Sequence, residues 1–211
     1  AEKVMAFEIE KKLAPYWLEN KIPNLEIVWG NVLREIESQQ TLQSLQSYKV
    51  VANLPYQITS QVLRVFLEME HGPELLVLMV QKEVAERICA AAGDMSVLAV
   101  SVQYYGEPEI VAQVPKSYFW PMPAVDSAII KIRLTHKPEN KEKVDLFFKI
   151  VKAGFASRRK MLVKNLSSII PKEDLQKIFR ALSLDEKVRA QELSMRQWQQ
   201  LVDELQTLQF V

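Results

Sequence analysis

The sequence predicts an α/β protein: a Rossmann-like sheet domain followed by a small all-α domain. Short β-rich runs alternate with helix-like segments over the first two thirds of the 211 residues, a pattern typical of parallel strands joined by helical crossovers. From about Val144 onward, apolar residues recur at helical spacing instead. A polar stretch, 135–143, separates the two patterns. We therefore expect a sheet domain over residues 1–136 and a helical domain over residues 137–211.

The sheet domain is expected to contain parallel strands and one antiparallel pair. The runs Tyr48–Ala52 and Leu75–Val80 are apolar without alternation, which predicts strands covered on both faces. The last two runs follow each other without a full helix between them, so we expect an antiparallel pair at a sheet edge. The expected strands are Val4–Phe7, Leu25–Val28, Tyr48–Ala52, Leu75–Val80, Ile110–Val114 and Ser127–Leu134, and the expected helices are Glu10–Glu19, Thr59–Met69 and Lys82–Ala92.

The C-terminal domain is expected to be helical throughout. In its first helix, apolar side chains recur at helical spacing from Phe148 to Ile169. Pro171 opens a second helix, which runs to about Leu182, because proline is tolerated in the first turn. A third helix begins near Ser194, since serine is a common helix N-cap.

Composition fits a globular protein. Hydrophobic residues make up 48% of the chain, and no apolar run approaches the ~20 residues that span a bilayer. We expect a cytoplasmic protein without membrane contact, and the single cysteine, Cys89, fits a reducing compartment. One cysteine and two histidines, far apart in sequence, give no metal-site spacing.

Charge is distributed unevenly along the chain. Residues 1–134 carry 12 Lys and Arg against 16 Asp and Glu, whereas residues 135–211 carry 15 against 10. The asymmetry indicates either a polyanionic partner for the C-terminal part or ordinary scatter of surface charge.

The sequence lacks the glycine-rich turn that usually opens a nucleotide-binding α/β domain. Its 5 glycines are Gly30, Gly72, Gly93, Gly106 and Gly154, and no two lie close enough to form such a turn. The chain also opens directly with an apolar strand. We therefore expect that a first βα unit of about 30 residues is missing upstream, unless the protein naturally lacks it.

The segment Asn53–Tyr56 (Asn-Leu-Pro-Tyr) directly follows a predicted strand, where open α/β sheets bind ligands. Asparagine offers a carbonyl acceptor and two amide donors, proline leaves nearby carbonyls free, and a tyrosine ring stacks on bases. Together they could hold an exocyclic amine and clamp its ring. Taken alone, the tetrapeptide is better explained as a strand-ending turn, since Asn and Pro are common turn residues.

Five segments in order resemble one family. Asn53–Tyr56 matches the NLPY signature of amino-group methyltransferases, and 57–60 (QITS) is similar to the start of the next helix in the ribosomal RNA adenine dimethylases. Segments 79–87 (MVQKEVAER), 119–127 (FWPMPAVDS) and 155–166 (FASRRK, then NL) resemble further motifs of that family. The resemblance implies a class I methyltransferase sheet domain with S-adenosylmethionine as the methyl donor.

The resemblance also implies which residues bind the cofactor. Glu8, after the first strand, corresponds to the family's acidic residue at the ribose hydroxyls, a role that suits a carboxylate. Asn31 stands where the family usually has an aspartate that accepts the adenine amino group. Because asparagine is neutral, we expect weaker cofactor binding and an unchanged reaction. Asn53 would contact the cofactor as well. By position alone, Glu8 is better explained as a surface carboxylate, and Asn31 is explained equally well as a polar loop residue.

The implied catalytic residues are Asn53, Pro55, Tyr56 and Phe119. The Asn53 side-chain carbonyl and the Pro55 backbone carbonyl would accept the two N6 hydrogens of a target adenine. Tyr56 and Phe119 would form aromatic walls that replace the base's stacking when it leaves its helix. Core packing is the commoner role of a phenylalanine, but Trp120 and nearby prolines favour a rigid, partly exposed loop.

A basic cluster in the helical domain is the candidate RNA contact. Arg158, Arg159, Lys160 and Lys164 have no acidic residue among them within 154–164. On a helix whose other face is apolar, they would form a ridge facing phosphates, which arginine binds without reading sequence. The alternative is an ordinary solvated face.

The family implies dimethylation of N6 of two adjacent adenosines in a hairpin near the 3′ end of small-subunit ribosomal RNA. The expected partner is that RNA or the immature small subunit, and the expected state is a monomer without a metal. Two alternatives stay open. One is a large-subunit RNA methylase of the antibiotic-resistance type, which the VDS and FASRRK segments disfavour. The other is a non-catalytic RNA-binding or ribosome-assembly factor, which the absent glycine turn favours.

Overall fold

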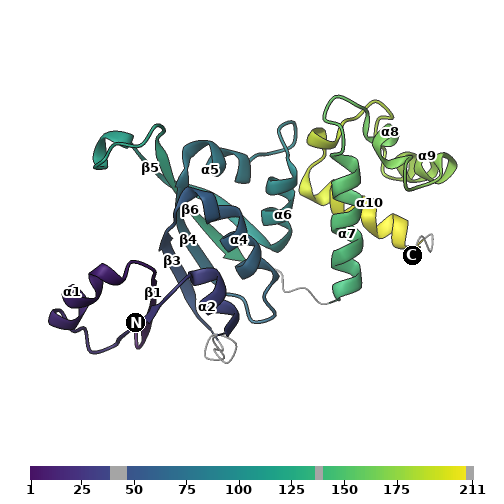
Figure 1. The fold of residues 1–211 in the computed structure, drawn as a ribbon. Coiled ribbons are helices and arrows are strands. Elements are labelled where there is room, and N and C mark those ends of the chain that lie inside the picture. The colour runs from purple at the N-terminus through teal and green to yellow at the C-terminus, as the bar shows by residue number, and fades with distance from the viewer. Residues whose placement is uncertain (39–46, 136–139, 208–211) are drawn as a thin grey trace.

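The computed structural model describes residues 1–38, 47–135 and 140–207 as a sheet domain with a helical unit packed beside it (Figure 1). The larger sheet has four strands in the order β3-β4-β6-β5, and β1 and β2 form a separate parallel pair. This arrangement confirms the expected α/β architecture with a helical C-terminal part. The strands are β1 (Val4–Glu8), β2 (Leu25–Trp29), β3 (Lys49–Asn53), β4 (Leu75–Gln81), β5 (Gly106–Val114) and β6 (Ser127–Leu134).

The loops that carry the predicted site leave the larger sheet at one edge. β3 and β4 run parallel, with Asn53 beside Met79. β6 is antiparallel to β4 and β5, so its first residue, Ser127, lies beside Gln81 at the end of β4 and beside Val114 at the end of β5. The expected antiparallel pair at a sheet edge is thereby confirmed.

One strand is less covered than its apolar sequence predicts. In β4, Leu76, Leu78 and Val80 are fully buried, whereas Val51 in β3 is 80% exposed. Within the described part of the chain, β3 pairs only with β4 and is an outer strand of the sheet. The prediction that this run is covered on both faces is therefore wrong, because apolar composition does not report which elements lie over a strand.

Helices α4, α5 and α6 cover one face of the larger sheet (Figure 1). The amphipathic α4 buries Val62, Leu63 and Phe66 against the sheet, as its apolar spacing predicts. The helices of the sheet domain are α1 (Ala14–Glu19), α2 (Val32–Ser38), α4 (Thr59–Glu68), α5 (Lys82–Ile88) and α6 (Val97–Tyr105).

The sequence pattern predicts neither α2 nor α6. Helix α6 begins with an uninterrupted apolar run, Val97–Val100, so its helical period is hidden. Helix α2 is short and follows Asn31, whose Oδ1 accepts a hydrogen bond from the Leu33 N–H (3.0 Å). Helix α5 ends at Ile88, earlier than the predicted Ala92.

The helical unit has its own core around Trp198, which is fully buried and stacks on Phe155 at a centroid distance of 5.4 Å. It packs on the sheet domain through Tyr104 of α6, whose ring lies 4.4 Å from Phe147 and 5.4 Å from Phe148. Its helices are α7 (Lys141–Gly154), α8 (Leu162–Leu166), α9 (Lys172–Ala181) and α10 (Met195–Thr207).

The helices α9 and α10 begin where proline and serine signals predict, but the first helix differs. α7 ends at Gly154 and α8 begins at Leu162, so the segment to Ile169 is not one helix. Phe155 and Leu162 are seven residues apart, which is about two helical turns, and a turn between them leaves the apolar period intact. The expected domain boundary between residues 136 and 137 lies outside the described residues.

Candidate active site

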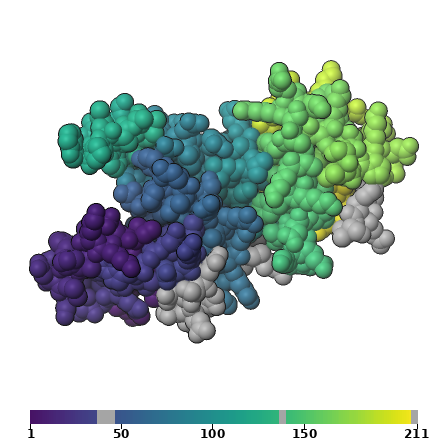
Figure 2. All heavy atoms as spheres, viewed as in Figure 1, coloured from purple at the N-terminus to yellow at the C-terminus, as the bar shows by residue number. Residues whose placement is uncertain are grey.

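The residues predicted for the site lie at or just beyond the carboxyl ends of strands. Glu8 ends β1, and Asn31 follows β2. Asn53 ends β3, Tyr56 follows it, and Phe119 lies in the loop after β5. Figure 2 shows a hollow in the surface between the N-terminal part, in purple, and this loop, in teal-green. The larger sheet thus brings Asn53, Tyr56 and Phe119 to one edge, and Glu8 and Asn31 lie together at the ends of the separate β1–β2 pair.

Asn53 presents an unengaged amide at this edge. Its side chain is exposed and has no hydrogen-bond partner among the described residues. Leu54 is buried and anchors the turn that follows. The Pro55 carbonyl accepts a hydrogen bond from the Ile58 N–H (3.1 Å). Since a carbonyl oxygen has two lone pairs, Pro55 can still accept a second donor.

Tyr56 is held by its hydroxyl. The hydroxyl lies 2.8 Å from Oγ of Ser127, a hydrogen bond between residues 71 positions apart. Ser127 is fully buried at the start of β6, and Tyr56 is half-buried. A ring fixed at its polar end in this way can serve as a stacking surface for a base.

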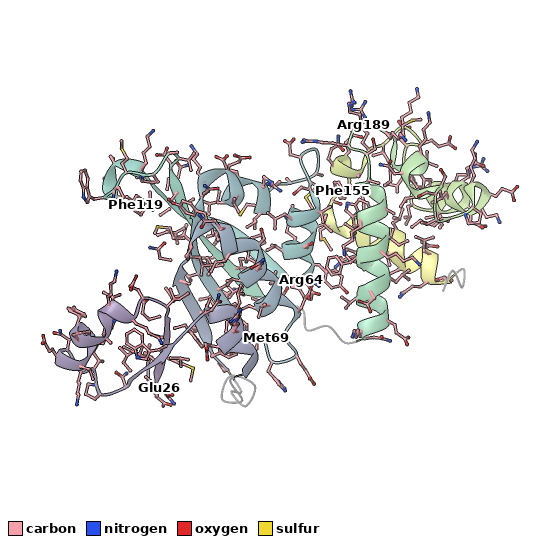
Figure 3. All side chains as sticks on the ribbon, viewed as in Figure 1. Glu26, Arg64, Met69, Phe119, Phe155 and Arg189 are labelled. Carbon is pink, nitrogen blue, oxygen red and sulfur yellow. The ribbon has the colours of Figure 1, made fainter. Side chains whose placement is uncertain are left out.

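Phe119 is half-buried in the loop 115–126, which projects beyond β5 (Figures 1 and 3). Its backbone N–H donates to the Lys116 carbonyl (3.2 Å), and the Lys116 N–H in turn donates to the Asp126 carboxylate (3.0 Å). The neighbouring Trp120 is 97% exposed. The loop is therefore partly exposed, as expected, and its first turn is tied to the residue that precedes β6.

The two predicted cofactor residues at the ends of β1 and β2 each accept one hydrogen bond from a backbone N–H through their side chains. Glu8 Oε1 accepts from the Glu10 N–H (2.7 Å), and Asn31 Oδ1 accepts from the Leu33 N–H (3.0 Å). The Gly30 N–H donates to the Glu8 backbone carbonyl (2.9 Å), which holds the neighbouring Asn31 close to Glu8. The second Glu8 oxygen has no partner among the described residues, whereas the Asn31 oxygen needed for an adenine amino group is shared with the α2 cap.

The basic cluster lies mainly in a turn, so the prediction of a helical ridge is wrong. Arg158, Arg159 and Lys160 are exposed in the turn between α7 and α8, and Lys164 alone lies on α8. Within the described ranges, no ion pair joins any of the four to an acidic side chain. We call Arg158–Lys160 the basic turn.

The basic turn and the Phe119 loop lie far apart along the molecule. Figure 3 shows Phe119 toward the left of the view and Arg189 on the helical unit, on the other side of α5 and α6. Arg189 lies near the basic turn, because the neighbouring Val188 carbonyl accepts a hydrogen bond from the Leu162 N–H (2.8 Å). A nucleic acid in contact with both regions would have to extend along the molecule.

Other features add no catalytic group. A cavity of about 320 Å³ lies beside the Phe119 loop, but its walls include none of the predicted site residues, and both charge signs line it. It is lined by Lys82, Glu83, Glu86, Lys116, Ala124, Val125 and Asp126. In the described ranges we find no group of His, Cys, Asp and Glu side chains placed to hold a metal ion. None of the described helices is long and apolar enough to cross a membrane.

Sequence reasoning gave no role to three polar residues that the structure places at key contacts: Asp126, Ser127 and Asn165. Ser127 and Asn165 are buried, and Asp126 is half-buried. A usable signal exists for Ser127, a polar residue that opens an otherwise apolar strand, and for Asn165, which is flanked by apolar helical positions. The partner of Ser127 lies 71 positions away in sequence, and those of Asp126 and Asn165 lie between 8 and 11 positions away, so none of these contacts leaves a local periodic pattern.

Comparisons with known proteins give consistent matches. The family model described as "Ribosomal RNA adenine dimethylase" matches residues 1–207. A protein of Dehalococcoides mccartyi named ribosomal RNA small subunit methyltransferase A is 40% identical over 95% of this chain and 70% of its own length. One of Clostridioides difficile with the same name is 36% identical over 98% of this chain and 75% of its own length.

Solved structures show the same fold. The crystal structure of the 23S rRNA methyltransferase ErmE has a TM-score of 0.78 at 24% identity, over 98% of this chain and 83% of that one. A dimethyladenosine transferase from Plasmodium falciparum has a TM-score of 0.79 at 22% identity, with the same coverage. With a family model that matches nearly the whole chain, and relatives of this identity and coverage, this chain belongs to the ribosomal RNA adenine dimethylase family.

Proposed function

We propose that this chain transfers methyl groups from S-adenosylmethionine to N6 of two adjacent adenosines in a hairpin near the 3′ end of small-subunit ribosomal RNA. Membership of the family supports the reaction. Relatives named as small-subunit methyltransferases are 35–42% identical to this chain, which supports small-subunit RNA over large-subunit RNA as the substrate. The likeness to ErmE, at 24% identity, supports the fold alone.

The observation that carries the proposal is the unengaged Asn53 amide, three residues from an aromatic ring fixed by its hydroxyl. N6 of adenine is a weak nucleophile, because its lone pair is delocalised into the ring. Asn53 Oδ1 and the Pro55 carbonyl would accept the two N6 hydrogens, which favours a pyramidal nitrogen whose lone pair can attack. Orientation and fixed dipoles then supply most of the acceleration. The alkylated nitrogen is acidic and loses its proton to solvent, so a general base is not required.

The residues of β1 and β2 fit a nucleoside cofactor, which supplies a methyl group on a sulfonium sulfur. Glu8 retains one carboxylate oxygen for ribose hydroxyls, because Glu10 uses only the other. Asn31 fits less well, because its oxygen caps α2 and carries no charge. Asn53 would contact the same cofactor from β3. Tyr56 and Phe119 would enclose the flipped adenine.

The helical unit would hold the RNA backbone. Arg158, Arg159, Lys160 and Lys164 are exposed cations without acidic partners in the described ranges, and such groups bind phosphate without reading sequence. The proposed partner is small-subunit RNA within the immature subunit, the proposed site of action is the cytoplasm, and the proposed state is a monomer.

The proposal is tested with Asn53→Ala in the full chain, measured as transfer of labelled methyl groups to small-subunit RNA and to immature small subunits. Removal of a group that stabilises developing charge lowers kcat by about 100-fold or more. Asn20→Ala serves as the control, because Asn20 is an exposed asparagine whose amide donates within α1 to the Tyr16 carbonyl (2.8 Å). Large-subunit RNA is assayed in parallel.

Each outcome is informative. Transfer by Asn53→Ala at the wild-type rate refutes the assigned role. Faster methylation of large-subunit RNA than of small-subunit RNA refutes the proposed substrate. Tight RNA binding by the wild-type chain without any turnover favours the non-catalytic assembly factor instead.

A further inference from the structure

The start of β6 joins two parts of the proposed site that are distant in sequence. Ser127, the first residue of β6, is fully buried and shares a hydrogen bond of 2.8 Å with the Tyr56 hydroxyl. A buried hydroxyl without a partner is costly, and Tyr56 is the only partner of the Ser127 side chain among the described residues. The position of the Tyr56 ring is therefore coupled to β6.

The preceding residue, Asp126, holds the other aromatic loop. Its carboxylate accepts the Lys116 N–H (3.0 Å), and the Lys116 carbonyl accepts the Phe119 N–H (3.2 Å). The Asp126 backbone carbonyl also accepts the Lys82 N–H (3.0 Å), which fixes Asp126 against the start of α5. The turn that precedes Phe119 is thus anchored at a point one residue away from the anchor of Tyr56.

We infer that Asp126 and Ser127 are positioning residues that together set the spacing of Tyr56 and Phe119 around the target adenine. The inference rests on the proposed function. Asp126 and Ser127 are adjacent in the chain, so the backbone fixes the separation of their Cα atoms. Each then reaches its aromatic loop or ring through one side-chain hydrogen bond, which sets the gap between the two rings. Stacking and in-line attack require an accurate distance between the rings, because a small displacement of the bound base strongly lowers the rate of transfer.

The test compares variants that remove each tie while both rings stay present. Ser127→Ala and Tyr56→Phe each remove one of the two hydroxyl groups that share a hydrogen bond. Asp126→Ala removes the carboxylate that accepts the Lys116 N–H. Each is expected to lower kcat roughly three- to tenfold, with little change in KM for RNA, since phosphate contacts elsewhere dominate RNA binding. The double variant Ser127→Ala with Tyr56→Phe should lose no more than the worse single variant, because both remove the same interaction.

Rescue and control variants separate positioning from folding. Asp126→Asn keeps an acceptor oxygen and should retain more kcat than Asp126→Ala. Ser117→Ala is the matched control for Ser127→Ala, because Ser117 is an exposed serine of the same loop without a side-chain hydrogen bond among the described residues. Thermal midpoints and S-adenosylmethionine affinity are measured for every variant, so that loss of fold is recognised.

The outcomes distinguish this inference from the function it rests on. If Ser127→Ala, Tyr56→Phe and Asp126→Ala keep the wild-type kcat while Asn53→Ala is inactive, the positioning role is overturned and the function stands. Strictly additive losses in the double variant, or lowered midpoints with unchanged kcat, also overturn it. If Asn53→Ala and a ring deletion, Tyr56→Ala, are both fully active, the proposed function itself fails.

Discussion

The side-chain amide of Asn165 donates a hydrogen bond of 2.5 Å to the carbonyl of Gly154, the last residue of α7. It donates a second, of 3.0 Å, to the carbonyl of Ser157 in the following turn. The last carbonyls of a helix lack donors within the helix. Asn165, on α8, supplies a donor for one of them, the carbonyl of Gly154. A single buried side chain therefore ties the end of α7 to the turn that presents Arg158 and Arg159.

Replacement of Asn165 by alanine is expected to destabilise the helical unit by about 1–3 kcal/mol, because two carbonyls lose their donor in a buried place. Asn165→Asp should cost at least as much, since an ionised carboxylate cannot donate. Urea unfolding monitored by circular dichroism measures both. An unfolding midpoint equal to that of the wild type in either variant contradicts this account of the turn.

The basic turn should contribute to RNA affinity through phosphate contacts. We expect Arg158→Ala with Arg159→Ala to weaken binding similarly for all RNA sequences and to lower the salt slope of log K by about 0.7–0.9 for each phosphate that is no longer neutralised. Lys172→Ala, an exposed lysine of α9 outside the proposed RNA-binding residues, is the control. Filter binding or anisotropy over a range of salt concentrations gives the slopes. An unchanged slope in the double variant would mean that the turn is only a solvated surface.

Asn31→Asp should tighten cofactor binding. Aspartate keeps the oxygen that accepts the Leu33 N–H and caps α2, and it adds a charge that strengthens a hydrogen bond from an adenine amino group. The gain expected from a charged acceptor is about 1 kcal/mol, or roughly fivefold in Kd. Calorimetric titration with S-adenosylmethionine measures it. Asn31→Ala should instead weaken cofactor binding and destabilise α2. Equal affinities of the wild type and both variants would show that Asn31 does not contact the cofactor.

The sequence predicts local elements well and tertiary partners poorly. The six strands follow from apolar runs, and α9 and α10 begin where Pro171 and Ser194 indicate. The spacing of Phe155 and Leu162 wrongly predicts a helix across the basic turn, because the turn between them keeps the helical period. The pattern misses α6 because that helix is apolar on nearly every side.

The candidate site shows the same limit. Asn53, Tyr56 and Phe119 are suggested by motif and by position after strands, and the structure brings them to one side of the molecule. The bond between Tyr56 and Ser127 joins residues 71 positions apart. No periodicity or propensity encodes such a pair, since it arises only when β6 is placed antiparallel beside β4.

Tyr48 should make stability depend on alkaline pH. Burial raises the pKa of Tyr48 from 10.0 to about 12, and its hydroxyl donates to the His71 carbonyl (3.0 Å). Because the folded pKa is higher than the unfolded one, the stabilising contribution is complete below pH 10 and declines as pH rises toward 12. Urea unfolding of the wild type and of Tyr48→Phe between about pH 9 and about pH 12 tests this. The variant should show a shallower decline, and identical declines would contradict the assignment.

The two tryptophans Trp198 and Trp120 should differ sharply in their contribution to stability. Trp198 is fully buried and Trp120 is 97% exposed, so Trp198→Ala should cost about 3–5 kcal/mol of unfolding free energy, whereas Trp120→Ala should stay within about 0.5 kcal/mol. Trp198→Phe should cost less than Trp198→Ala for two reasons. It leaves a smaller cavity, and it removes the buried Nε1 hydrogen that has no acceptor among the described residues. Chemical denaturation of the three variants measures these differences, and a Trp120→Ala destabilisation as large as that of Trp198→Ala would show that the exposed loop is part of the folded core.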